Sequence, residues 1–153
     1  MGECLDHVNR FSSFSACLFD PYQSVHSGLG TGISASAFTR HNIPTTIVEI
    51  DPAVYAAARQ YFGLPDPGAD NIFLEDAKGW VTNKRASISA AGTKATQNLY
   101  DIVVHDCFSG GAVPKHIFTL EFWQDLKTIM NPEGVLAVVS LRQYYFNLSS
   151  DQR

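Results

Sequence analysis

Three carboxylates of this chain come shortly after apolar segments and could bind a polar ligand there. They are Glu49, Asp76 and Asp106, and the segments before them are rich in Val, Ile, Phe or Leu. A carboxylate can accept hydrogen bonds from a ribose diol, from the exocyclic amine of adenine or from an attacking amine, because its two oxygens offer about four acceptor sites. Each acid also has an ordinary alternative role as the cap of a following helix or loop. Taken together, the three acids favour a nucleoside-binding site.

A glycine-rich segment precedes these acids and could bring backbone close to a ligand. Gly28, Gly30 and Gly32 alternate with Leu29 and Thr31, and glycine removes the steric barrier of a Cβ atom. A tight turn between a strand and a helix also requires glycine, so this motif alone is weak evidence. The first of the three acids follows about 17 residues after the last glycine, a spacing typical of an acid that binds ribose.

The apolar pattern predicts strands that alternate with helices. Asp51 and Pro52 have the residue types of an N-cap and a first helical position. The strands are expected at 24–27, 45–50, 71–74, 100–104 and 135–141, and the helices at 33–40, 52–62 and 119–130, with a short one around Trp80. This alternation indicates an α/β fold with a doubly wound, Rossmann-like, mostly parallel sheet. Ligands of such sheets bind beyond the carboxyl ends of the strands, where the glycine segment and the acids fall.

We expect one domain in this chain of 153 residues. An irregular N-terminal segment is predicted over 1–24, a nucleoside-binding transferase domain over 25–141 and a tail over 142–153. Residues 84–98 are rich in Ala, Ser, Thr and Gly and show no helical periodicity. They are therefore predicted to form a mobile surface insertion.

The composition argues against several partners. The formal net charge is −4 and no segment concentrates Lys and Arg, so we expect no nucleic-acid partner. No apolar run approaches the length that spans a membrane. The three Cys and five His residues lack the spacing of a metal site or a disulfide framework, so no metal is predicted. A cytoplasmic location is expected because no signal peptide is evident.

Six motifs together resemble one known family. They are GLGTG at 28–32, VEIDP at 48–52, EDA at 75–77, YDIVVHD at 100–106, HIFTLEFW at 116–123 and NPEGVLAV at 131–138. In order and spacing the set is similar to the catalytic domain of the spermidine/spermine synthase family, which is a variant of the class I methyltransferase fold. The resemblance covers about 110 of the 153 residues.

The resemblance implies roles for the site residues. The cofactor would be S-adenosylmethionine or its decarboxylated form, with its amino-acid portion at the glycine segment. Glu49, with Ile50 beside it, would bind the ribose, and Asp76 with Ala77 would bind the adenine. Asp106 would be the catalytic acid that accepts the proton of an attacking amine. The partner would be a small-molecule acceptor such as a polyamine, and a homodimer is a possible assembly.

The chain departs from the family pattern at several places. Ser109 stands where aminopropyltransferases carry a second Asp, Thr31 replaces an Asp of their glycine loop, and residues 1–24 show no counterpart of their β-rich segment. Methyl transfer is therefore as plausible as aminopropyl transfer. The first strand is expected to be weak because only Val25 is strongly apolar. The usual C-terminal β-hairpin is expected to be missing, so the sequence predicts a truncated domain.

Two alternatives remain open at this point. Gly30, Gly32 and Ala35 fit the Gly-x-Gly-x-x-Ala pattern of an NAD-dependent dehydrogenase. That pattern leaves Asp76 and Asp106 unexplained. The second alternative is a truncated, non-catalytic domain that binds a nucleoside.

Overall fold

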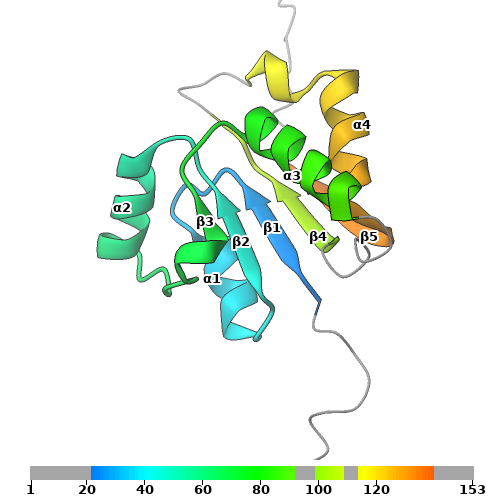
Figure 1. Ribbon diagram of the computed structural model, residues 1–153. Coiled ribbons are helices and arrows are strands. Elements are labelled where there is room, and N and C mark those ends of the chain that lie inside the picture. The colour runs from blue at the N-terminus through cyan, green and yellow to red at the C-terminus, as the bar shows by residue number, and fades with distance from the viewer. Residues whose placement is uncertain (1–21, 92–98, 109–113, 140–153) are drawn as a thin grey trace, which may run out of the picture.

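The computed structural model describes residues 22–91, 99–108 and 114–139, and these residues form one parallel sheet with helices on both faces (Figure 1). The strand order is β3-β2-β1-β4-β5, and every neighbouring pair is parallel. The strands are β1 (Ser24–Ser27), β2 (Thr45–Val48), β3 (Ile72–Phe73), β4 (Tyr100–His105) and β5 (Met130–Val138). The helices are α1 (Ile33–Arg40), α2 (Pro52–Tyr61), α3 (Ala77–Ala91) and α4 (Leu120–Thr128), with the 3-10 helices η2 (Ala69–Asn71) and η4 (Lys115–Ile117). The predicted α/β fold is confirmed.

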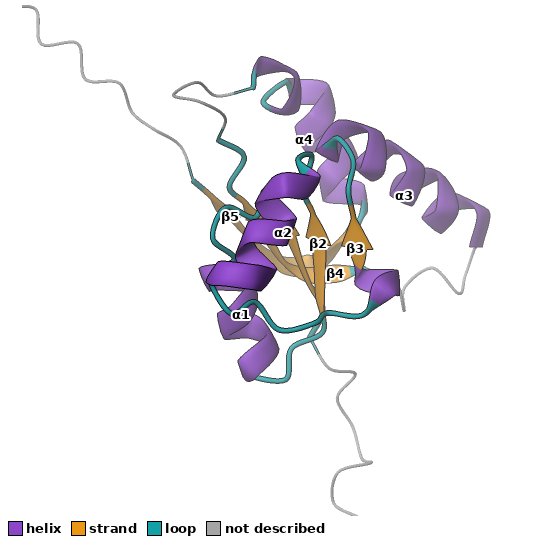
Figure 2. Ribbon diagram, turned by 90° about the vertical axis from the view of Figure 1, so that its left-hand side faces the viewer, coloured by secondary structure: helices purple, strands orange, loops and turns teal. Residues whose placement is uncertain are grey.

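The sheet separates two hydrophobic cores. Helices α1 and α2 cover one face, and α3 and α4 cover the other (Figures 1 and 2). The first core contains Ile47 of β2 together with Ala35 and Ala58 from the two helices. The second core contains Val103 of β4 and Trp80 of α3. Burial on both faces explains why the strands carry apolar side chains at successive positions.

The helices that flank β2 follow from local sequence signals. Helix α1 has the predicted bounds. Helix α2 begins at Pro52, and the carboxylate of Asp51 accepts a hydrogen bond from the backbone N–H of Ala53 at 2.8 Å. Gly63 follows the helix with a φ of 67°, a left-handed conformation that glycine adopts without strain. The predictions for both helices are confirmed within one residue.

Strand β1 corrects the expectation of a weak first strand. It is the central strand, paired with β2 on one side and β4 on the other, and all four of its residues are buried. Its polar side chains find partners inside the protein: Oγ of Ser24 donates to Oγ1 of Thr45 at 3.1 Å. Oγ of Ser27 lies 3.2 Å from Nδ1 of His105. Hydrogen bonds across the strands replace the apolar contacts that the sequence lacks.

Helix α3 corrects the prediction of a mobile insertion at 84–98. The helix continues to Ala91, so residues 84–91 are helical, and 92–98 lie outside the described residues. Ile88 packs against the core, and Arg85 forms an ion pair with Asp125 of α4. These contacts with distant residues stabilise a segment that shows little periodicity of its own. At 15 residues, α3 is the longest helix in the described part, where no helix is long and apolar enough to span a membrane.

Strand β5 lies at one edge of the sheet and begins five residues before the predicted position. It pairs with β4 through a register shift between Tyr100 and Ile102. Gly134 fits closely there, because a Cβ at this position would lie 3.0 Å from the carbonyl oxygen of Asp101. Among the described residues no strand pairs with the outer edge of β5. The predictions for 1–21 and for 140–153, including the missing hairpin, lie outside the described residues.

Candidate nucleoside-binding site

A cavity of about 640 Å³ opens at the carboxyl edge of the sheet. Its walls come from the loop after β1, the end of β2, the turn between β3 and α3, the end of β4, and η4. The predicted site residues that line it are Gly28, Leu29, Gly30, Glu49, Ile50, Asp76, Ala77 and Asp106. Thr31 and Gly32, which were also predicted to bind the cofactor, do not line it. The fold therefore gathers most of the predicted residues around one space.

The three glycines of the loop have different structural roles. A Cβ on Gly28 would lie 2.1 Å from the carbonyl oxygen of Asp106, and the φ of Gly28 is 83°. Only glycine allows the ends of β1 and β4 to approach this closely. A Cβ on Gly32 would lie 3.1 Å from Leu64, so Gly32 serves the packing of α1 on its neighbours. Gly30 lines the cavity and has no atom within 4 Å of its Cβ position, which leaves space for a ligand.

Glu49 holds the glycine loop from the end of β2. Its side chain is buried, and Oε2 accepts a hydrogen bond from the N–H of Leu29 at 2.8 Å. Oε1 accepts one from the N–H of Asp51 at 2.9 Å. Each carboxylate oxygen can accept a second hydrogen bond. Glu49 can therefore fix the loop and still present acceptors to a ribose diol.

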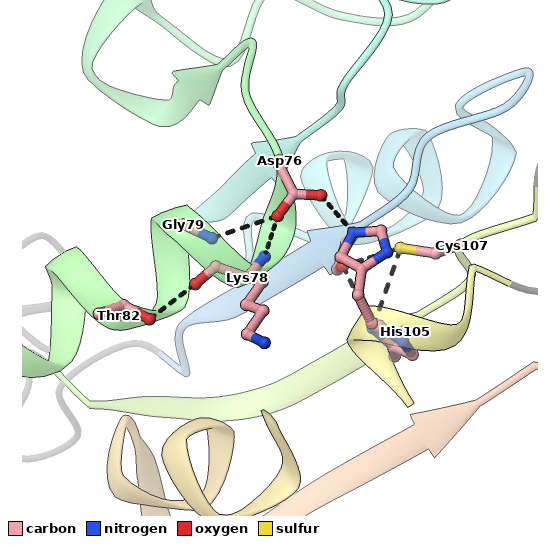
Figure 3. A network of polar contacts seen from close by, with 8 residues as sticks. Asp76, Lys78, Gly79, Thr82, His105 and Cys107 are labelled. Carbon is pink, nitrogen blue, oxygen red and sulfur yellow. Dashed lines mark hydrogen bonds and ion pairs between the residues drawn. The ribbon is translucent and has the colours of Figure 1, made fainter. Parts of the chain in front are cut away.

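Asp76 caps helix α3 and also faces the cavity. Its Oδ1 accepts hydrogen bonds from the N–H groups of Lys78 at 2.9 Å and Gly79 at 3.3 Å, and its Oδ2 lies 2.7 Å from Nε2 of His116 (Figure 3). Burial raises the pKa of Asp76, but the hydrogen bonds from His116, Gly79 and Lys78 and the attraction of His116 outweigh it and lower the pKa. The carboxylate thus stays ionised, and the helix-cap role is present beside the proposed ligand contact.

Asp106 directly follows β4 and is exposed at the cavity wall. Its N–H donates to the carbonyl oxygen of Ser27 at 2.8 Å, which extends the pairing of β1 and β4 up to the cavity. Within the described ranges no side chain binds its carboxylate, so this group is available to a ligand. Ser109, Gly110 and Gly111, which follow in the sequence, lie outside those ranges.

Cys107 is a neutral thiol in the cavity wall. Burial raises the pKa of this thiol to about 11, a hydrogen bond with Ser27 opposes the shift, and the charges of Glu49, Asp106 and Asp76 raise it further. The thiolate, rather than the thiol, is the nucleophile of cysteine chemistry. Cys107 is therefore a wall residue, and its raised pKa reflects mainly its burial, with a smaller contribution from the three acids of the cavity.

Carboxylates dominate the charge of this cavity. Glu75 joins Glu49, Asp76 and Asp106 in the lining, and His116 is the single basic side chain among the described lining residues. Such a potential attracts a cation and repels a phosphate. The carboxylates of the cavity therefore fit a sulfonium nucleoside, whose ribose and amine groups need hydrogen-bond acceptors. They do not fit a dinucleotide with a pyrophosphate.

Several lining residues escaped sequence reasoning. His116 is not among the site residues predicted from the sequence, yet it lies at the cavity beside Asp76. Val54, Phe108 and Pro114 add apolar wall to the same space. A signal was present for His116, which opens the motif HIFTLEFW, but the contact spans 40 positions of sequence and no local pattern encodes it.

The parallel sheet with helices on both faces has the class I S-adenosylmethionine-dependent methyltransferase type of fold, as solved structures show. Human methyltransferase-like protein 13, solved in complex with SAH, is similar with a TM-score of 0.57 and 28% identity over 76% of this chain and 53% of that chain. A probable spermidine synthase from Corynebacterium glutamicum shares the fold with a TM-score of 0.58 and 20% identity, over 77% of this chain and 39% of that one.

The family model of the spermine/spermidine synthase domain matches residues 27–150, and the chain belongs to this family. A curated relative, the N-terminal histidine N-methyltransferase of Emericella nidulans, is 42% identical over 111 residues, which is 72% of this chain and 18% of the relative. The polyamine aminopropyltransferase of Vibrio vulnificus is 33% identical over 111 residues, 71% of this chain and 34% of the relative. The chain thus spans between about a fifth and a third of the length of these curated relatives.

The family assignment confirms the resemblance predicted from the six motifs. It gives no support to the NAD-dependent dehydrogenase, which the charge of the cavity also disfavours. The relatives include both a methyltransferase and aminopropyltransferases. The chain thus belongs to a family in which these two named relatives transfer different groups.

Proposed function

We propose that this chain forms the part of a group transferase that binds S-adenosylmethionine or decarboxylated S-adenosylmethionine. The observation that carries the proposal is the acidic cavity at the carboxyl edge of the sheet, with Glu49, Asp76 and Asp106 in its wall. A sulfonium carries a positive charge and no phosphate, so this potential favours it. Human methyltransferase-like protein 13, with the same fold, was solved with SAH, which supports a nucleoside of this type.

Different residues of the chain are proposed to bind the donor and to accept the proton. Glu49 would accept the ribose hydroxyls while it holds the glycine loop, and Asp76 would accept a hydrogen bond from the adenine amine. When bound, the donor supplies a carbon that is already activated for in-line displacement. The protein then has to position a nucleophile and take up its proton. Asp106, whose carboxylate has no partner side chain in the described residues, is proposed to hold the acceptor and accept that proton.

The proposal also concerns which group is transferred and which acceptor receives it. Thr31 and Ser109 replace two acids of the aminopropyltransferase pattern, and the exposed Thr31 does not line the cavity. We propose a small-molecule acceptor with an amine, such as a polyamine, and keep methyl transfer beside aminopropyl transfer. The domain over 25–141, the homodimer, the cytoplasmic location and the truncated, non-catalytic alternative also remain proposals.

Calorimetric titration with 5′-methylthioadenosine, the nucleoside shared by both donors, tests the site. We expect Glu49→Gln to weaken binding by about tenfold or more, because a charge-assisted hydrogen bond is typically worth about 1.5–3 kcal/mol. Glu133→Gln, in the exposed part of β5, is the matched control and should bind like the wild type. A melting curve without ligand reports the separate loss of the contact to Leu29.

The outcomes of this titration are distinct. Unchanged affinity in Glu49→Gln would remove Glu49 from the site. A wild-type chain that binds neither the thioether nucleoside nor a sulfonium donor would overturn the proposed function. If the nucleoside binds but a separate activity assay with a sulfonium donor shows no turnover, the non-catalytic alternative is favoured.

Asp106→Asn tests whether this carboxylate faces the sulfonium. The wild type should prefer S-adenosylmethionine over the uncharged thioether S-adenosylhomocysteine. The variant should lose about fivefold of that preference, the size expected for one exposed charge pair, with little change in affinity for the thioether. Asp70→Asn, an exposed acid outside the cavity, serves as the control. An equal loss for both ligands would make Asp106 a ligand of their shared nucleoside instead.

A further inference from the structure

His116 and Asp76 join two segments across the rim of the cavity. Asp76 lies in the turn before α3, and His116 lies in η4, 40 positions later. Nε2 of His116 is 2.7 Å from Oδ2 of Asp76. Figure 3 shows the Asp76 carboxylate reaching toward an imidazole ring on one side and the start of α3 on the other.

The backbone of η4 is fixed independently of this contact. Ile117 is 3% exposed and belongs to the core cluster on the α3–α4 face of the sheet. Its backbone N–H donates to the carbonyl oxygen of Pro114 at 3.3 Å. The neighbouring His116 is therefore presented to the cavity from a rigid support.

The pair itself adds little to the stability of the fold. The side chain of His116 is 51% exposed and that of Asp76 is 37% exposed, and exposed ion pairs contribute about 0–1 kcal/mol. Asp76 already caps α3 through Oδ1 without any help from His116. The contact thus has its main consequence at the cavity, which both residues line.

The acceptor sites of Asp76 show what that consequence is. A carboxylate offers about two acceptor sites on each oxygen. The N–H groups of Lys78 and Gly79 use Oδ1, and His116 uses one site of Oδ2. One site of Oδ2 is left, and it suits a single N–H donor from a ligand.

We propose that His116 is the positioning residue that sets the preference of this cavity for adenine. By binding Oδ2, it holds the Asp76 carboxylate in one orientation and leaves one acceptor for the exocyclic amine of the base. The inference rests on the proposed function, because it assumes that a nucleoside occupies the cavity. Its own content is that recognition of the base depends on η4 as well as on the turn before α3.

The test compares two probes, 5′-methylthioadenosine and 5′-methylthioinosine, by calorimetry. Inosine replaces the exocyclic amine by a carbonyl, which a carboxylate repels, so the wild type should prefer the adenosine probe by about tenfold or more. His116→Ala should lower that preference about fivefold, a typical coupling between contacting residues. His116→Gln, whose amide can donate to Asp76, should restore it. Lys115→Ala, the exposed neighbour in η4, is the control for lost positive charge.

Each outcome decides a different question. A wild type that binds neither probe overturns the proposed function and the inference with it. If the wild type binds the probes, three results for His116→Ala would overturn only the role of His116. The variant could keep the full preference for the adenosine probe, or it could lose affinity for both probes equally. It could also bind the probes more tightly, because the imidazole ring stood in the way of the base. Should His116→Ala fail to fold, His116→Phe keeps a ring without a donor, and the same ratio of affinities decides.

Discussion

Strands β1 and β5 both pair with β4, and they reverse the usual relation between polarity and burial. Strand β1 reads Ser-Val-His-Ser, and every one of its residues is buried. In β5, Val135 is 61% exposed, Leu136 40% and Val138 43%. The polar strand is in the centre of the sheet, and the apolar strand is at its edge.

The difference shows that position in the sheet decides burial here. A central strand has neighbours on both edges and helices on both faces, so its polar groups must find partners inside the protein. Ser24 and Ser27 do so through Thr45 and His105. His26 and His105 do so in part, because Nε2 of each ring is buried without a partner in the described residues. Strand β5 carries no such requirement, because in the described part of the chain its side chains are exposed on both faces.

The largest expected effect is that of acid pH, which destabilises the polar centre of the sheet by protonating its two buried histidines. Burial lowers the pKa of His26 to about 4, and it lowers the pKa of His105 to about 4 as well. Since both rings are neutral when folded and have a pKa of 6.5 in the reference state, the unfolded chain binds more protons between these values. Stability is therefore complete above pH 6.5 and is lost as the pH falls toward 4, by roughly 3 kcal/mol for each ring.

Urea unfolding between pH 4.5 and 6.5 measures this loss. The free energy of unfolding should fall by up to about 1.4 kcal/mol per pH unit for each histidine. Nδ1 of His26 lies 3.2 Å from Oγ of Ser34. His26→Asn keeps an amide near this hydroxyl and does not titrate, so the slope should be about half that of the wild type. The exposed His41 is the control, and His41→Asn should leave the slope unchanged. A wild type with no slope in this range would show that the two rings are charged or hydrated when folded.

Sequence reasoning succeeded where the signal was local and failed where the partner was distant. The start of α2 follows from Asp51 and Pro52, whose cap and fixed dihedral act within one turn. The burial of β1 depends on Thr45 and His105, which contribute their side chains only after the sheet has formed. The same limit explains why the helical state of residues 84–91 was missed.

The candidate site divides in the same way. The glycine loop and the acids at the strand ends follow from topology, because parallel strands bring their carboxyl ends to one edge. The contact between His116 and Asp76 does not, since it needs the exact approach of η4 to the turn before α3. The different roles of the glycines could not be predicted from the sequence either. A Cβ at Gly28 would clash with the backbone of Asp106, which comes 78 residues later.

The smallest expected effect is that of one valine-to-threonine substitution made in each of the strands β1 and β5. Threonine has nearly the shape of valine and an equally good strand propensity, so it adds a hydroxyl and little else. Val25→Thr places that hydroxyl in a position that is 1% exposed and should cost about 1–3 kcal/mol. Val135→Thr places it in water and should change the stability by less than about 0.5 kcal/mol. Urea unfolding at pH 7.5, where the two histidines are not protonated in either state, measures both changes in the free energy of unfolding.

A cost at Val135 as large as that at Val25 would mean that β5 is covered in solution. If that cost grows with protein concentration, the cover is a second copy of the chain, and if it does not, the cover is a segment of the same chain outside the described residues.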